Sequence, residues 1–197
     1  MPLPSFDPAD YTSQLSDKLE SFKKAFTKFG LPEPMVFAST PLHYRMRAEF
    51  RMWHQDERVD YAMFDSDNPK QPVIIEEFAA ATQSICTLMP RLRERLQASE
   101  TLKRRLFQIN FLATLSGDLL VTLIYHRPLD ESWETAAREM ANEFNIRLIG
   151  RSRKQKIVLD RDWVLEEFEL NGRQLCYQQI EGSFSQPNAG VNRQMLG

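Results

Sequence analysis

The chain has 197 residues, of which 42% are hydrophobic and 26% are charged. This length allows one substantial hydrophobic core, and the composition is typical of a globular domain. The 25 basic and 27 acidic residues give a formal net charge of -2, which excludes any argument for nucleic-acid binding from overall charge. A nucleic-acid site would therefore require local segregation of charge.

The sequence lacks the patterns that identify metal and membrane proteins. Cys86 and Cys176 are far apart, so neither a zinc site nor a disulfide framework is indicated, and we expect no metal. No apolar stretch approaches membrane-spanning length, and residues 1–11 show no basic segment followed by an apolar one. We therefore expect a cytoplasmic protein with no membrane partner. No phosphate-binding loop or hydrolase motif is present, so residue chemistry alone indicates no catalytic residue.

An amphipathic helix is predicted over residues 11–29. Asp7-Pro8 is a favourable start, because the aspartate side chain can accept from free amides and proline fits the first turn. Gly30 and Pro32 would end the helix. Apolar residues recur at spacings of three and four, namely Tyr11, Leu15, Leu19, Phe22, Phe26 and Phe29.

Residues 43–54, HYRMRAEFRMWH, alternate in the manner of a strand, and with residues 59–64 they predict a hairpin. One face would carry apolar residues (Met46, Ala48, Phe50 and Met52), and the other would carry mainly charged ones (Arg45, Arg47, Glu49, Arg51 and Trp53). Guanidinium groups and an indole at this spacing suit phosphates and exposed bases. Alternating charges are also common on the solvent-exposed face of antiparallel strands, where cross-strand ion pairs form. The residues alone favour the second interpretation.

A second helix is predicted over residues 78–98, and Pro90 is expected to kink it or split it in two. Its polar side continues into the densest cationic segment of the chain, residues 91–105, which Glu94 and Glu100 only partly offset. This segment is a stronger indication of a polyanion partner than the overall charge.

The remaining elements alternate between strands and one helix. Residues 106–115 and 118–126 flank Ser116-Gly117 and predict a hairpin, whose second strand is apolar on both faces and should lie near the middle of a sheet. A helix is predicted over residues 131–144, and strands over 146–150, 156–159, 163–170 and 173–180. The predicted class is α+β, a mostly antiparallel sheet with two to four helices.

The last residues, 183–197, differ in kind from the rest. Pro187-Asn188 would open a helix whose apolar residues, Val191, Met195 and Leu196, have no later segment in this sequence to pack against. We expect a domain boundary near Gly182, with residues 1–182 as one domain and residues 183–197 as a linker and the first turns of another, so that the chain is truncated. The alternative is a frayed tail. Such an apolar segment could also lead to self-association.

Four segments carry a resemblance to a known family: HYRMRAEFRMWH, KRRLFQINFLATLSGDLLVTLIYH, LIGRSRKQKIVLD and SFSQPNAGVN. They resemble the N-terminal half of the bacterial tRNA (uracil-5-)-methyltransferases, over residues 11–197. The resemblance implies methyl transfer from S-adenosylmethionine to one uridine of the tRNA T loop, forming ribothymidine. It also implies an N-terminal RNA-recognition domain followed by a Rossmann-like methyltransferase domain, with the tRNA T-arm as partner.

The resemblance assigns roles to individual residues. Gln186 matches a glutamine that contacts S-adenosylmethionine, and Phe107 matches a phenylalanine that stacks within the T loop. The alternative for Phe107 is that it continues the apolar face of Ile109 and Phe111 into the core. Three arginines fall in a block near the RNA, namely Arg45, Arg47 and Arg51.

The groups that the family uses for catalysis are not matched. In the family, a cysteine thiolate from a Cys-Asn-Pro motif adds to the pyrimidine ring before methyl transfer, and a glutamate later removes the proton. Cys86 lies in ICT and Cys176 in LCY, so neither matches. We expect an RNA-binding chain without activity of its own, which would contribute one edge of the cofactor site. The alternative is a non-catalytic interaction module that retains the fold and associates with itself or with a partner protein.

Overall fold

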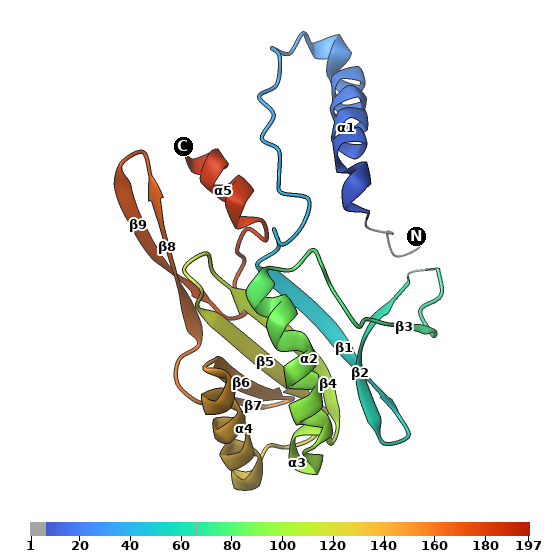
Figure 1. The fold of residues 1–197 in the computed structure, drawn as a ribbon, viewed down its shortest axis with the longest axis vertical. Helices are drawn as coiled ribbons and strands as arrows, with labels where there is room; N and C mark the ends of the chain where they lie inside the picture. Colours follow the sequence, from blue (N-terminus) through green and yellow to red (C-terminus); the bar gives the residue numbers. More distant parts are fainter. Residues whose placement is uncertain (1–6, 66) are drawn as a thin grey trace.

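The structure is a computed structural model that describes residues 7–65 and 67–197; residues 1–6 and 66 of the predicted N-terminal domain lie outside this description. It contains a seven-stranded sheet, a separate two-stranded hairpin and five α-helices within the described residues (Figure 1). The predicted α+β class with a mostly antiparallel sheet is thereby confirmed. The helices are α1 (Tyr11–Phe26), α2 (Gln83–Gln97), α3 (Glu100–Lys103), α4 (Glu131–Phe144) and α5 (Ala189–Leu196). The strands are β1 (Arg47–Gln55), β2 (Arg58–Phe64), β3 (Pro72–Ile74), β4 (Leu106–Ala113), β5 (Leu119–Tyr125), β6 (Arg147–Ser152), β7 (Gln155–Val158), β8 (Trp163–Leu170) and β9 (Arg173–Ile180).

The strands of the large sheet lie in the order β3-β2-β1-β4-β5-β6-β7. All neighbours are antiparallel except β5 and β6, which run parallel because α4 connects them as a crossover. Both predicted hairpins, β1–β2 and β4–β5, are confirmed. The strand predicted to be apolar on both faces, β5, lies between β4 and β6, as a strand buried on both sides should.

Helices α2 and α4 cover one face of the sheet, and the main core lies between them and the strands (Figure 1). The alternation predicted for β1 is confirmed, because Ala48, Phe50 and Met52 are buried on this face. Gly150 of β6 is required here, since a Cβ at this position would overlap the ring of Trp133, which is fully buried. The helix-covered face therefore contains the apolar side of β1 and most of the buried residues of β2, β4 and β5.

Helix α2 differs from its prediction in two respects. It begins at Gln83 instead of residue 78, because residues 78–81 form a turn and the chain then pairs with Arg45: the Arg45 amide donates to the Ala80 carbonyl and the Thr82 amide to the Arg45 carbonyl. A kink or a split was expected at Pro90; the split does not occur, because the helix is continuous through this residue. A proline inside a helix costs about 3 kcal/mol, and burial of the neighbouring apolar residues offsets that cost.

The β8–β9 hairpin packs on the second face of the sheet at one end. It covers a small apolar cluster, Leu112, Leu120, Ile149 and Val164. We call this cluster the closed end of the second face. Glu166 of β8 is fully buried there and accepts hydrogen bonds from the Leu115 amide (2.9 Å) and the Gln179 side chain (3.2 Å). Burial raises the pKa of the Glu166 carboxyl, although these donors oppose the shift.

The chain from residue 183 onward passes beside the start of β1 before α5 begins. The Met46 amide donates to the Pro187 carbonyl (2.7 Å), and the Asn188 side chain accepts from the Val191 amide (3.0 Å) and caps α5. Val191 is half-buried, whereas Met195 and Leu196 are exposed. Among the described residues, none of the helices has both the length and the apolar character needed to cross a membrane.

Candidate nucleic-acid interface

Three side chains stack on the second face of the sheet, at the end that the β8–β9 hairpin leaves uncovered. The rings of Phe107 and His126 are 3.9 Å apart at their centres and tilted by 25°, and the guanidinium carbon of Arg51 lies 3.9 Å from the centre of the Phe107 ring. Two planar groups cannot lie this close to one ring face without clashing, so Arg51 and His126 occupy opposite faces. We call these three residues the stacking cluster.

An irregularity in β4 places Phe107 in this cluster. The register between β4 and β5 shifts between Leu106 and Gln108, so Phe107 is the extra residue of a bulge. The neighbours Leu106 and Ile109 are buried in the main core, whereas Phe107 is half-buried on the second face. The alternative in which Phe107 continues the core face of Ile109 and Phe111 is therefore wrong, because the bulge reverses the alternation at this point.

The cationic segment over residues 91–105 divides into two parts. On α2, Arg93 lies 3.4 Å from Asp60, and Arg95 lies 3.2 Å from Glu143. These arginines hold the helix against β2 and α4, and are engaged within the fold. Among the described residues, five exposed cations around the stacking cluster have no carboxylate within ion-pairing distance: Arg51, Arg104, Arg105, Arg153 and Lys154.

These cations lie on segments that come together where neighbouring strands of the sheet begin or end. Arg51 pairs with Gln108 near the start of β4, the His126 amide donates to the Arg105 carbonyl, and Arg151 near the end of β6 pairs with Ile124 of β5. Phe107, His126, Arg153 and Lys154 line one cavity, and with Arg51 they form the region that we call the open end of the second face. Arg104 and Arg105 line a neighbouring cavity that also contains Asp56, Glu57 and Glu100. Exposed aromatic and cationic groups in combination are suited to unpaired bases and phosphates.

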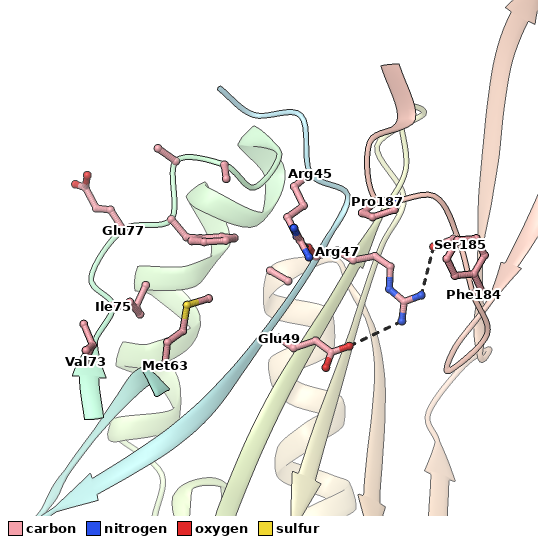
Figure 2. A pocket seen from close by; sticks show the side chains of 14 residues that line it. Arg45, Arg47, Glu49, Met63, Val73, Ile75, Glu77, Phe184, Ser185 and Pro187 are labelled. Atoms are coloured by element: carbon pink, nitrogen blue, oxygen red, sulfur yellow. Dashed lines mark hydrogen bonds and ion pairs between the residues drawn. The ribbon is translucent and has the colours of Figure 1, made fainter. Parts of the chain in front are cut away.

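Arg47 and Arg45 lie at the other end of β1 and have different surroundings. Arg47 donates to the Ser183 carbonyl (2.7 Å) and lies 3.9 Å from Glu49; Figure 2 shows it extending from β1 toward Ser185. Arg45 donates to the Arg47 carbonyl (2.9 Å). Of the three arginines that the sequence places near RNA, only Arg51 lies beside Phe107, and Arg47 instead holds the segment that follows residue 182.

Gln186 lies in that segment, between Ser185 and Pro187. Its side chain is exposed and has no hydrogen-bond partner among the described residues, so its amide is free to contact a ligand. The segment borders a cavity of about 810 Å³, whose opposite wall is formed by Met63, Val73 and Ile75 (Figure 2). Pro187 is held beside Met46, five residues before Arg51. At about 3.4 Å per residue, about 17 Å of strand separates Gln186 from the stacking cluster.

Sequence reasoning missed three residues of the open end. His126 was one of three scattered histidines with no indicated role, and only its alternation with Ile124 could have placed it on the second face. Arg153 and Lys154 form the turn between β6 and β7. Two consecutive cations between predicted strands were the available signal, but a solvated turn gives the same pattern.

Neither cysteine is prepared to act as a nucleophile. The Cys86 thiol donates to the carbonyls of Phe78 (3.3 Å) and Ala81 (3.2 Å), and burial raises its pKa. Loss of solvation and the Glu167 carboxylate raise the pKa of the Cys176 thiol. A nucleophilic cysteine requires a lowered pKa. Within the part of the chain that the structure describes, no group of three or more His, Cys, Asp or Glu side chains is arranged to hold a metal.

The fold is similar to that of a solved RNA-modifying enzyme. The crystal structure of Pyrococcus abyssi tRNA (uracil-54, C5)-methyltransferase in complex with S-adenosyl-L-homocysteine matches 94% of this chain and 47% of that chain. The TM-score is 0.64 and the sequence identity is 15%. At this identity the likeness shows the fold alone.

Sequence comparison defines the family. A family model for tRNA (Uracil-5-)-methyltransferase matches residues 10–197, and the chain therefore belongs to this family. The tRNA/tmRNA (uracil-C(5))-methyltransferases of Aromatoleum aromaticum and Dechloromonas aromatica are 73% and 66% identical to it over 197 residues. The match covers 100% of this chain and 54% of each relative, so the chain spans about half the length of the curated relatives it matches.

Proposed function

We propose that this chain is the RNA-recognition part of a tRNA uracil-5-methyltransferase that methylates a T-loop uridine with S-adenosylmethionine. The open end of the second face would hold the T-arm, and the segment around Gln186 would form one edge of the cofactor site. Residues 1–182 would form the RNA-recognition domain, and residues 183–197 would lead into the methyltransferase domain.

The observation that carries the proposal is the stacking cluster with its unpaired cations. An aromatic ring stacked on an exposed imidazole can be extended by an unpaired base, and each base stacked in this way contributes about 1–3 kcal/mol. The His126 side chain is exposed, so a base can stack on its outer face without displacing Arg51. Alternatively, a base that displaces Arg51 from Phe107 frees a guanidinium for a phosphate. Both arrangements combine stacking with charge neutralisation.

Gln186 fits a contact with the cofactor, since an exposed amide without an internal partner can both donate and accept. Arg47 is a positioning residue in this proposal, because it holds the Ser183 carbonyl and with it the chain that carries Gln186. S-adenosylmethionine supplies the methyl group when it is bound. The role of this chain is to hold the RNA and to present one edge of the cofactor site.

The proposal is tested by binding of the chain to two RNA hairpins, one with the T-arm sequence and one with the same stem and an unrelated loop. We expect preferential, salt-sensitive binding to the T-arm hairpin, because phosphate contacts release counterions. Arg51→Ala should weaken it, and Arg173→Ala, at the tip of the β8–β9 hairpin, should not. Equal affinity for the two hairpins would contradict T-arm recognition.

We expect no methyl transfer by the 197-residue chain alone. Neither Cys86 nor Cys176 lies in a Cys-Asn-Pro motif, and the pKa of each thiol is raised. The assay is transfer of a labelled methyl group from S-adenosylmethionine to unmodified tRNA by the purified chain. Detectable transfer above a no-enzyme control would contradict this part of the proposal.

A second candidate function is self-association without RNA binding. The exposed side chains of Met195 and Leu196 favour it, since exposed apolar residues promote association. Analytical ultracentrifugation separates the two functions. A monomer that binds the T-arm hairpin would exclude the second candidate, whereas a dimer that is lost in Met195→Ser and does not bind RNA would support it.

A further inference from the structure

A cavity of about 870 Å³ lies beside the stacking cluster, between the ends of β5 and β6. Its walls combine an aromatic and apolar side, which includes Phe107, Ile124 and Pro128, with a cationic side. The volume falls within the range of about 300–1,000 Å³ that is usual for small-molecule sites. No carboxylate lines the cavity, although four cationic side chains do: Arg127, Arg151, Arg153 and Lys154.

Two of these four cations are engaged by the fold. Arg151 donates to both carboxylate oxygens of Glu181, at 2.9 and 2.6 Å. Arg127 donates to the carbonyls of Arg104 (3.0 Å) and Thr101 (2.6 Å). Both side chains are fixed and contribute positive charge to the cavity wall, but their donors are largely used.

The other two cations, Arg153 and Lys154, form the β6–β7 turn and have no partner among the described residues. The turn itself is held in place. The Gln155 side chain accepts from the Leu129 amide (2.8 Å) and donates to the Leu129 carbonyl (3.1 Å), and its oxygen also accepts from the Ser152 hydroxyl (2.9 Å). These bonds tie the turn to the segment that follows His126. Two adjacent like charges on a fixed turn repel one another, and an anion bound between them offsets this repulsion.

We propose that this cavity is a second nucleotide subsite, in which a base lies against Ile124, Pro128 and the edge of the Phe107 ring while its phosphate binds Arg153 and Lys154. The inference rests on the proposed function, because the ligand is an RNA strand whose neighbouring base stacks on the same Phe107–His126 pair. The apolar wall accepts any base, since every base has an aromatic face, and the cations recognise the phosphodiester. The subsite fixes the path of the strand as it leaves the stacking cluster.

The test compares a double substitution at the turn with a matched loss of charge elsewhere. Arg153→Gln with Lys154→Gln removes the two cations of the subsite, and Lys24→Gln with Arg173→Gln removes two exposed cations from α1 and from the start of β9. Both variants have the same net charge. Binding of the T-arm hairpin is measured across a salt series, and thermal unfolding confirms that each variant is folded.

We expect the turn variant to bind on the order of tenfold more weakly at low salt. The slope of log K against log salt should be smaller by about 0.7, the value for one phosphate contact with a single strand. The control variant should change neither quantity. In a second measurement, hairpins that carry one neutral methylphosphonate at successive loop positions should lose affinity for the wild-type chain at one or two positions. The turn variant should be insensitive at those same positions.

The results separate this inference from the proposed function. If the turn variant matches the control in affinity and slope while Phe107→Ala weakens binding, the subsite is wrong and T-arm recognition stands. If the wild-type chain does not distinguish the T-arm hairpin from an unrelated one, the proposed function fails and the subsite fails with it. A lower salt slope in the turn variant, without any loop position that is sensitive to methylphosphonate, also contradicts the subsite. The two cations would then act only through long-range electrostatic attraction to the RNA.

Discussion

The two ends of the second sheet face have opposite surroundings, and β1 passes through both. Near the closed end, Arg47 is bonded to the Ser183 carbonyl and lies beside Glu49. At the open end, four residues along the same strand face, Arg51 lies over Phe107 and has no carboxylate partner among the described residues. The same residue type on the same face therefore positions a chain segment at one end and is available to a ligand at the other.

The arginines along β1 therefore do not form one site. The closed end is covered by the β8–β9 hairpin, whose Glu166 is hydrogen-bonded within the fold. At the open end, the β8–β9 hairpin does not cover the stacking cluster or the cations beside it. Substitutions at the closed end should therefore change stability, and substitutions at the open end should change RNA binding.

The largest expected effect is at the closed end. Leu120 is 1% exposed in the cluster under β8, so Leu120→Ala should lower the free energy of unfolding by about 3 kcal/mol, from lost burial and the cavity left behind. Urea unfolding measures this. The control is Leu115→Ala, in the exposed β4–β5 turn, which should change stability by less than about 0.5 kcal/mol. RNA binding by the folded Leu120→Ala protein should be unchanged; selective loss of binding would contradict the separation of the two ends.

The next effect is at the open end. Phe107→Ala should weaken binding to the T-arm hairpin by about 10- to 100-fold, because one stacked base contributes about 1–3 kcal/mol. Its stability should fall less than that of Leu120→Ala, since Phe107 is only half-buried. Fluorescence anisotropy measures the affinity. Phe29→Ala, an exposed aromatic far from the sheet, is the matched control and should bind as tightly as the wild type.

A smaller effect should distinguish the two arginines of β1. Arg47→Ala removes the hydrogen bond to the Ser183 carbonyl, which should loosen residues 183–188 by about 1 kcal/mol. The Met46 amide, which donates to the Pro187 carbonyl, should then exchange its hydrogen faster. Arg51→Ala should leave that exchange rate unchanged and weaken RNA binding instead. If both variants accelerate exchange equally, the two arginines do not have separate roles.

The smallest effect concerns pH and Glu166. Burial raises the pKa of this carboxyl in the folded chain, so the folded state retains the proton more strongly than the unfolded state. The free energy of unfolding therefore falls as pH rises above the pKa of the Glu166 carboxyl in the unfolded chain. It stops falling above the pKa of this carboxyl in the folded chain. Glu166→Gln should remove this loss, so its stability relative to the wild type should increase as pH rises from the ordinary glutamate pKa of about 4.3 toward neutral pH. Thermal unfolding across this range is the measurement, and a gain that is constant with pH would exclude titration of Glu166 as its cause.

Much of the fold could be predicted from the sequence, because the signals are local. Apolar periodicity located the helix beginning at Tyr11 and both hairpins of the large sheet, and the doubly apolar pattern placed β5 inside the sheet. The start of α2 was misplaced because the residues before it form a turn and are hydrogen-bonded to Arg45, which is far away in the sequence. The continuity of α2 through Pro90 depends on core packing that a residue pattern does not contain.

The candidate site was only partly predictable. The resemblance to the family indicated Phe107, Arg51 and Gln186 from their positions in matched segments, and their roles remain proposals. His126 was missed because its partner, Phe107, is brought beside it only by the β4–β5 pairing and the bulge. The cationic residues 91–105 were treated as one surface, although Arg93 and Arg95 of α2 face carboxylates on β2 and α4.

The alternation of β1, the hairpins and the helix periodicities follow from the sequence, since they depend on neighbouring residues. The family follows from segments that match those of its members. Only the tertiary structure decided which cations are free. An arginine is neutralised or left available according to what lies within a few ångströms, and the partner of Arg47 is 136 residues away along the chain. Coulomb interactions and stacking depend on distance in space, and that distance is set by sheet order, by one bulge in β4 and by the face that the β8–β9 hairpin covers.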